Sequence, residues 1–272
     1  MNEIVIVLIN YFKEEDLASF IRSRLLMQTG VSLRIYIVDN GSKVPALLDS
    51  LAMENVVVLK PGSNLGYFGA AHFAYEAFLK SNNGRIPEHF VVSNFDLEFD
   101  PENFFNHFIT IDKNVSAVVS GPAIMSSLSH DALNPIYPTR LTFAHLDRLI
   151  FVTSFYPFFY VYQLLHYFKR WMRKNELSES KGVEEVYAVH GSMMFFSQKY
   201  FDLGGTLKYD SFLYGEELFV AEQVRRMNLN CVVYHSLKVV HREHSTTGYV
   251  KGITHMRYLN HSLKFLKSRF FS

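Results

Sequence analysis

Apolar strand patterns alternate with amphipathic helix patterns through the first 120 residues of the chain. Continuous Val, Ile and Leu runs bounded by polar turns predict buried strands, whereas apolar positions three and four residues apart predict helices. The expected strands are Ile4–Asn10, Leu33–Asp39, Val56–Leu59, Phe90–Ser93 and Ala117–Ser120, and the expected helices are Glu15–Gln28 and Tyr67–Ser81. Strands separated by helices form βαβ units, so the pattern predicts an α/β fold with a mainly parallel central sheet flanked by helices.

The pattern changes at Leu149–Phe168, a run without formal charge that is rich in Phe and Tyr. A spanning helix needs about 20 mainly apolar residues, so the run is just long enough. Its proline, glutamine, histidine and tyrosines suit a membrane interface better than a lipid core. We therefore favour interfacial membrane contact over a buried aromatic insertion or a true span. Basic and aromatic residues that suit anionic headgroups follow at once: Lys169, Arg170, Trp171, Arg173 and Lys174.

The C-terminal stretch Ile253–Phe271 has an apolar stripe at helical spacing, with basic residues outside it. The stripe predicts a helix that either contacts the same membrane surface or packs against the sheet.

Composition narrows the class of protein. The chain has 272 residues, enough for one large α/β domain, and its 27 basic and 26 acidic residues give no sign of a nucleic-acid partner. The single cysteine, Cys231, excludes an internal disulfide and a cysteine zinc site, and fits a reducing cytosol. The apolar run Ile4–Ile9 lacks a basic leader and a small-residue cleavage site, so we interpret it as a strand and not as a signal peptide.

Oxygen ligands follow the expected strand Phe90–Ser93. Asn94, Asp96 and Glu98 share one side of an extended chain, at the sheet edge where open α/β folds bind ligands. Such oxygens suit Mg²⁺ or Mn²⁺, which in turn binds phosphate. The alternative is a polar strand end that caps the next turn, because Asp100-Pro101-Glu102 is typical of a helix start.

Two further turns have side chains and backbone suited to binding a nucleotide. Asp39, at the end of the second strand, can accept a hydrogen bond from a nucleobase N–H, although Asp39-Asn40-Gly41 also suits a simple Asx-turn. The loop Asn64–Ala71 has small residues and leads into a helix, whose N-terminus favours phosphate. Close packing of the helix against the sheet explains its small residues equally well.

Two acidic residues, Glu216 and Glu217, begin a predicted helix after an aromatic stretch. They can simply complement the helix dipole, or one can act as a general base. His241 ends a strand after Val239 and Val240, and only this position distinguishes it among the 12 histidines.

In this order the motifs resemble those of the family 2 glycosyltransferases, inverting enzymes of the GT-A fold, and in particular members that build bacterial surface polysaccharides, such as rhamnosyltransferases. The resemblance covers most of the chain and rests on an ordered set, each member weak or moderate alone: Ile9-Asn10-Tyr11, Val38–Ser42, Asn64–Ala71, Asn94-Phe95-Asp96 as a form of the Asp-x-Asp motif, Val189–Met194, Tyr214–Glu217 and His241.

The resemblance implies transfer of a sugar from a UDP- or dTDP-linked donor to a hydroxyl of a glycan or lipid-linked acceptor, with Mg²⁺ or Mn²⁺ as cofactor. It implies that Glu217 is the general base with Glu216 beside it, and that Asp96 and His241 bind the metal. The implied donor-binding residues are Asn10, Tyr11, Asp39, Asn64, Gly66, Phe68, Gly69, Asn94 and Gly191.

The chain departs from the family pattern at three places. Asn94 replaces an aspartate, so the metal site depends more on Asp96 and the donor diphosphate, and Glu98 is a possible replacement ligand. Glu217 stands where the family more often has aspartate. Residues 126–185 have no specific match.

We expect one domain over residues 1–272, with a nucleotide-sugar-binding half at 1–120, a variable aromatic and basic insertion at 121–186, an acceptor and catalytic half at 187–250 and an amphipathic helix at 251–272. The expected location is the cytoplasm, at the inner face of the cell membrane. A nucleotidyltransferase of similar fold, or a catalytically degenerate membrane-associated binding protein, are the alternatives. The donor sugar, the acceptor and the oligomeric state are not predicted.

Overall fold

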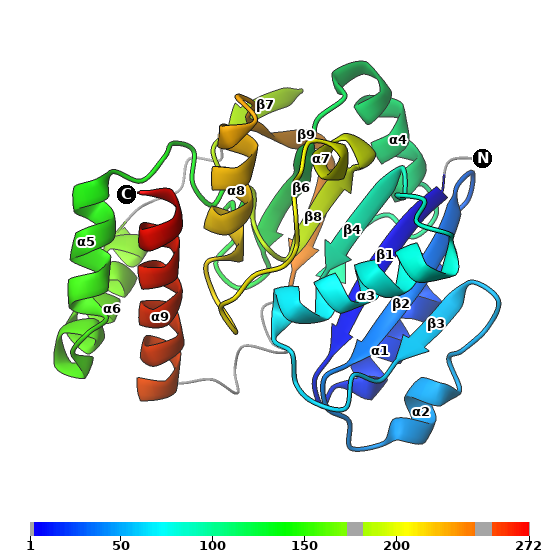
Figure 1. Ribbon diagram of the computed structural model, residues 1–272, viewed down its shortest axis with the longest axis horizontal. Coiled ribbons are helices and arrows are strands. Elements are labelled where there is room, and N and C mark those ends of the chain that lie inside the picture. Colours follow the sequence, from blue (N-terminus) through cyan, green and yellow to red (C-terminus); the bar gives the residue numbers. More distant parts are fainter. Residues whose placement is uncertain (1–2, 173–181, 243–251, 272) are drawn as a thin grey trace.

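A single curled sheet forms the centre of the molecule (Figure 1). The computed structural model describes residues 3–172, 182–242 and 252–271. The strands occur in the order β3-β2-β1-β4-β8-β6-β9-β5, and β7 pairs with β9. Their bounds are β1 Glu3–Asn10, β2 Ser32–Asp39, β3 Val56–Leu59, β4 His89–Ser93, β5 Leu97–Glu98, β6 Val119–Ser126, β7 Val183–Val186, β8 Met193–Ser197 and β9 Cys231–His241.

The sheet has a parallel part and a mixed part. Strands β1 to β4 pair in parallel, whereas β8 is antiparallel to both of its neighbours, β4 and β6. Strand β9 is parallel to β6 and antiparallel to β5 and β7. The expected α/β fold with a central sheet and flanking helices is confirmed.

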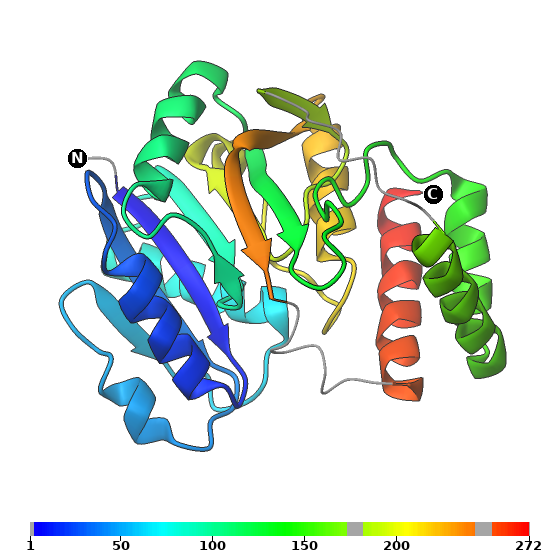
Figure 2. The ribbon, with the colours of Figure 1, turned by 180° about the vertical axis from the view of Figure 1, so that it is seen from behind.

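Helices cover both faces of the sheet (Figures 1 and 2). Along β1, Val5, Val7 and Ile9 pack into one core and Ile4, Ile6 and Leu8 into the other, which is why the strand is apolar throughout. Helices α3, α8 and α9 contribute to the first core, and α1 and α4 to the second. The helix bounds are α1 Glu14–Phe20, α2 Pro45–Asp49, α3 Tyr67–Ser81, α4 Phe104–Val115, α5 Phe143–Val152, α6 Tyr156–Met172, α7 Gln198–Asp202, α8 Glu216–Arg226 and α9 Ile253–Phe270.

Two expected elements have different bounds. The helix expected at Glu15–Gln28 begins as α1 and continues as a π-helical turn that ends at Leu25. The strand expected at Ala117–Ser120 is β6, which runs to Ser126 because pairing with β9 continues past an irregularity between Pro122 and Ala123.

The uncharged segment 149–168 lies in two helices, α5 and α6, and not in one continuous helix. The break follows Val152, where the Thr153 hydroxyl donates to the carbonyl of Leu149. From α9, the Asn260 side chain donates to Thr153 Oγ1 and to the Ile150 carbonyl, each at 2.9 Å. In both overall views, α9 lies between this hairpin and the rest of the molecule (Figures 1 and 2). No helix within the described ranges is long and apolar enough to cross a membrane, and Arg173 and Lys174 lie outside those ranges.

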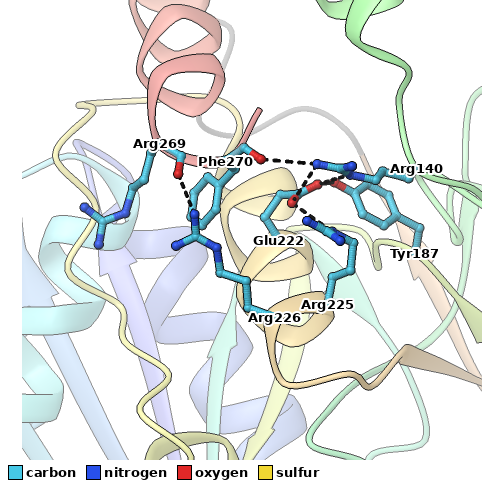
Figure 3. A network of polar contacts seen from close by, with 7 residues as sticks. All are labelled: Arg140, Tyr187, Glu222, Arg225, Arg226, Arg269 and Phe270. Atoms are coloured by element: carbon cyan, nitrogen blue, oxygen red, sulfur yellow. Dashed lines mark hydrogen bonds and ion pairs between the residues drawn. The ribbon is translucent and has the colours of Figure 1, made fainter. Parts of the chain in front are cut away.

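A buried carboxylate ties α8 to its surroundings (Figure 3). Glu222 accepts two hydrogen bonds from Arg140 (2.6 and 3.1 Å) and one from the Tyr187 hydroxyl (2.6 Å). Arg225 also donates to it, and Arg140 reaches the carbonyl of Phe270 at the end of α9. The network therefore joins α8 to the C-terminal helix and to the chain that leads into α5.

Candidate active site

The turn after β2 is held by its own side chains. Asp39 Oδ1 accepts from the backbone N–H of Gly41 (3.1 Å), which is the Asx-turn geometry, and Oδ2 accepts from the Ser42 hydroxyl (2.7 Å). Asn10, fully buried at the end of β1, donates to Asp39 Oδ1 and to the Gly41 carbonyl. The hydrogen bond from Asn10 thus fixes the direction in which the Asp39 carboxylate points.

Two aromatic rings lie beside this turn. The rings of Tyr11 and Phe12 are 4.5 Å apart, and a Cβ atom at Gly41 would come within 3.1 Å of the Phe12 ring. Phe12 has a positive φ of 57°, uncommon for a bulky residue, and its N–H donates to the Gly41 carbonyl. The rings and the turn form one unit that could receive a nucleobase.

The loop Asn64–Ala71 is joined to the same turn. The Asn40 side chain donates to the Gly66 carbonyl (2.9 Å) and accepts from the Leu65 N–H (3.2 Å). Gly66, at φ 74°, passes so close to the Phe212 carbonyl that a Cβ atom would lie 1.9 Å from that oxygen. Its small size therefore permits contact with the segment that precedes α8.

The remaining loop residues have different positions. Asn64 is exposed and accepts from the Gly66 N–H, while Gly69 packs against Leu65. Phe68 is in the core, 1% exposed and beside the ring of Phe196, so the structure does not bring it to the surface of a donor pocket.

Asp96 and His241 meet at the edge of the sheet. Asp96 Oδ2 lies 3.2 Å from His241 Nε2, and both side chains are nearly buried. His241 Nδ1 is buried and has no hydrogen-bond partner among the described residues. Burial alternates along 94–99, with Phe95, Leu97 and Phe99 inside, so Asn94, Asp96 and Glu98 share the outer side as expected.

Glu98 is held elsewhere, in an ion pair with Arg242. Within the described ranges, no three His, Cys, Asp or Glu side chains converge to hold a metal ion. Asp96 and His241 fit a divalent cation as a pair of ligands, with the remaining positions left for water or the oxygens of a diphosphate.

His190 lies next to this pair. Its ring is 6.0 Å from that of His241, and its Nδ1 is 2.9 Å from the Ser192 hydroxyl. Burial, and then the nearby His241, lower the pKa of His190 to about 4, so its ring is neutral at pH 7.

Gly191 connects Glu217 and Tyr67. The Glu217 carboxylate accepts from the Gly191 N–H at 3.2 Å, and the Tyr67 hydroxyl donates to the Gly191 carbonyl at 3.0 Å. A Cβ atom at Gly191 would lie 2.6 Å from Glu217 Oε1, so this carboxylate occupies the space of the missing side chain. Burial first, and then the charges of Glu216, Glu217 and Asp96, raise the pKa of Tyr67 well above its usual value.

The two adjacent carboxyl groups are both hard to ionise. Burial, and then the neighbouring Glu217, raise the pKa of Glu216 to about 8, and burial also raises the pKa of Glu217. Glu216 is 6% exposed, whereas Glu217 is half-buried. Glu216 is therefore protonated near pH 7, and Glu217 is the more accessible of the two carboxyl groups.

The turn before α8 is supported by α9. Tyr214 (φ 70°) and Gly215 (φ 83°) are both left-handed, and the Tyr214 carbonyl accepts from the Tyr209 and Ser262 hydroxyls. The Tyr214 ring stacks on His255 of α9, with centroids 4.4 Å apart. These contacts set the angle at which α8 presents Glu217.

Comparison with known proteins gives two similarities. No protein-family model matches the sequence. The chain is 24% identical over 243 residues to the low-salt glycan biosynthesis hexosyltransferase Agl10 of Haloferax volcanii, covering 89% of this chain and 68% of that protein. Its structure is similar to the crystal structure of GalNAc-T7 with UDP, GalNAc and Mn²⁺, with a TM-score of 0.53 and 13% identity over 99% of this chain. The chain spans half the length of that protein.

The fold is that of a GT-A glycosyltransferase. The Haloferax relative is, by its name, a hexosyltransferase of glycan biosynthesis.

Several residues of this candidate site were not expected from the sequence. Tyr67 lies inside the expected loop motif but carries no signal that its hydroxyl reaches Gly191. His190 lies inside another motif, and Tyr137, whose pKa burial and the charge of Glu217 raise to about 12, belongs to the unmatched region. Contacts between distant segments bring these side chains together, because the Tyr67 hydroxyl donates to the Gly191 carbonyl and Tyr137 pairs with Ala188.

Proposed function

We propose that the protein is an inverting glycosyltransferase, similar to family 2 enzymes, that moves a sugar from a nucleotide-diphosphate sugar to an acceptor hydroxyl. The observation that carries the proposal is the Glu217 carboxylate, held by the Gly191 N–H at the sheet edge and able to take up a proton. The GT-A fold and the similarity to a hexosyltransferase support the same class of reaction.

In the proposed mechanism the donor binds across the ends of β1, β2 and β4. The turn at Asp39 receives the nucleobase, with the rings of Tyr11 and Phe12 beside it. Asp96 and His241 would hold Mg²⁺ or Mn²⁺, and such an ion neutralises charge on a leaving diphosphate. Asn94, beside Asp96, contributes no charge, so the site holds its cation best when the donor is present.

Glu217 acts on the acceptor. Its carboxylate removes the proton from the acceptor hydroxyl while that oxygen forms a bond to the anomeric carbon, and the bond from that carbon to the diphosphate breaks with its electron pair. One base on the side opposite the leaving group is enough for this displacement, and the configuration is inverted. Glu216 remains protonated near pH 7 and so lets Glu217 be ionised beside it.

The proposed acceptor is a hydroxyl of a glycan or lipid-linked oligosaccharide in the assembly of a bacterial surface polysaccharide, and the proposed donor is UDP- or dTDP-linked. The sequence resemblance supports these details, and the name of the Haloferax relative supports glycan biosynthesis more generally.

The test is release of nucleoside diphosphate by the full chain from UDP-, dTDP- and GDP-sugars with Mn²⁺, with product anomers assigned by NMR. Glu217→Gln should lower turnover by about 10²–10⁴-fold, the usual contribution of a general base, with donor affinity nearly unchanged. Glu54→Gln, at an exposed position far from Glu217 in the sequence, is the matched control and should retain full turnover.

Three results would overturn the proposal. Release of pyrophosphate from a nucleoside triphosphate and a sugar phosphate would identify a nucleotidyltransferase. Full activity of Glu217→Gln would show that another residue is the general base, and Glu216 would then be the next candidate. Absence of any metal-dependent turnover or hydrolysis across the donors would indicate a binding protein on a transferase fold.

A further inference from the structure

The α5–α6 hairpin has an apolar surface that nothing in the described chain covers. The side chains of the hairpin that are between 50% and 59% exposed include Phe151, Phe155, Phe158, Val161, Leu164 and Leu165. We call these six residues the hairpin surface. An amphipathic surface helix normally turns such residues toward the core, and exposed apolar groups that are contiguous mark sites of interaction.

Packing elsewhere in the hairpin explains which residues face outward. Phe159 is 2% exposed and meets the ring of His255 on α9, so the inner side of α6 is already occupied. On the outer side, Phe158 contacts Phe151 (5.7 Å) and Phe155 (5.9 Å), which forms a three-ring cluster at the turn between the helices. The hairpin thus buries one side against α9 and presents a second, aromatic side outward.

The charge pattern indicates what this surface meets. No Asp, Glu, Lys or Arg occurs from Leu149 to Phe168, and Lys169 and Arg170 follow in the last turns of α6. Phe and Tyr with a basic flank are the composition that lies at the boundary between acyl chains and anionic headgroups. A helix of 17 residues that continues into basic residues is suited to lie at that boundary.

The hairpin surface is also connected to the site. The ring of Phe159, on the inner side of α6, is 5.5 Å from His255, and His255 stacks on Tyr214 at 4.4 Å. Tyr214 lies two residues before Glu216, at the start of the helix that carries Glu217. Ring contacts therefore connect the inner side of α6, through His255, to the turn before the helix that carries the proposed base.

We propose that the hairpin surface binds the interface of an anionic phospholipid bilayer. The three Phe rings enter the headgroup region, and the positive charges that the sequence places at Lys169 and Arg170 complement anionic headgroups. If the proposed function holds, the acceptor is presented by that bilayer, as a sugar hydroxyl on a lipid-linked chain. This last step rests on the proposed function, whereas bilayer binding does not.

The test uses the full chain with vesicles of phosphatidylcholine alone and of phosphatidylcholine mixed with phosphatidylglycerol. The single tryptophan, Trp171, belongs to α6 and reports binding by a blue shift of its emission, while co-sedimentation gives the partition coefficient. We expect binding to the mixed vesicles, weaker binding to the neutral ones, and a decrease with added salt.

Two variants separate the apolar and basic contributions. Phe155→Ser with Phe158→Ser should lower partition to both kinds of vesicle by about tenfold or more. Each substitution removes an aromatic ring whose exposed area would be buried in the bilayer. Lys169→Gln with Arg170→Gln should lower partition only to the anionic vesicles, by roughly tenfold. Met27→Ser with Leu203→Ser, at exposed apolar positions outside the hairpin, is the matched control and should bind like the parent chain.

Failure of this proposal is distinguishable from failure of the proposed function. Absence of vesicle binding, equal binding by the Phe155/Phe158 variant, or a dimer in solution that this variant abolishes would each overturn the bilayer proposal; the last would assign the surface to a second copy. Turnover on a water-soluble acceptor would meanwhile leave the proposed function intact. Vesicle binding without turnover would support the bilayer proposal and count against the enzyme.

Discussion

Gly191 lies at a point where the site has no room for a side chain. A methyl group there would meet Glu217 Oε1 at 2.6 Å and displace the carboxylate from the Gly191 N–H. We expect Gly191→Ala to lower turnover by about 10²-fold, the usual cost of misplacing a reacting group by about 1 Å. Donor affinity should change little. A loss of donor affinity without a loss of turnover would contradict the proposed position of the base.

Glu216 gives the site a pH-dependent cost in stability. Because burial and the neighbouring Glu217 raise its pKa to about 8 in the folded chain, the folded state holds a proton that the unfolded state releases near the ordinary pKa of 4.5. The unfolded state then binds fewer protons, so stability falls as pH rises between these two values. Glu216→Gln should flatten this fall. Melting temperatures from about pH 5 to pH 8 measure it, and parallel curves for variant and parent would refute the assignment.

Single residues were predictable where one motif determines them. Asp39 makes the Asx-turn that Asp-Asn-Gly indicates, and Glu217 begins a helix as the paired acids suggest. Tyr67 and His190 were not predictable as site residues, because their roles depend on Gly191, Asp96 and His241, which belong to other strands and loops.

At the scale of elements, the Glu222 network holds α8 in place. Glu222 is fully buried, and removal of one member of a buried pair typically costs several kcal/mol. We expect Glu222→Ala to lower the free energy of unfolding by about 3 kcal/mol, the lower end of the usual range of about 3–5 kcal/mol, because Arg140 is partly exposed and can turn to solvent. Urea denaturation measures the loss. Glu54→Ala is the control, and equal stability of the two variants would show that the network is not stabilising.

Elements with continuous apolar runs were predicted well from the sequence. The bounds of β3 and α3 agree to the residue, and β1, β2 and β4 to within one. The predicted end of β6 at Ser120 was wrong, because pairing with β9 continues the strand through Gly121 and Pro122 to Ser126. The break between α5 and α6 was not predicted, although Pro157 lies in the first turn of α6, and Asn260 of α9 holds it by a contact over more than a hundred residues.

At the scale of the whole molecule, donor and metal should stabilise the fold together. A ligand at 100 times its Kd contributes about 2.7 kcal/mol, which raises the melting temperature of a chain of this size by roughly 5–10 °C. We expect UDP with Mn²⁺ to give such a shift and Asp96→Asn to remove its Mn²⁺-dependent part. Glu98→Gln is the matched control, because Glu98 pairs with Arg242. An equal loss in both variants would argue against Asp96 as a metal ligand.

The overall architecture was foreseeable to a different degree in its two halves. The alternation of strand and helix patterns in the first 120 residues predicts the parallel part of the sheet directly. The rest of the sheet is antiparallel at β8 and parallel again between β6 and β9, an order that local patterns do not encode. The position of the hairpin, outside α9, likewise depends on tertiary packing.

The proposed metal site depends on the register in which β5 pairs with β9. Leu97 is the register partner of His241, and Asp96, one residue earlier, meets the His241 ring. A shift of this pairing by one residue would move the imidazole along the strand by about 3.3 Å and out of reach of the carboxylate. Both ligands could therefore be retained and the site still lost through a single insertion in either strand. Its evolution is constrained in spacing as much as in residue identity.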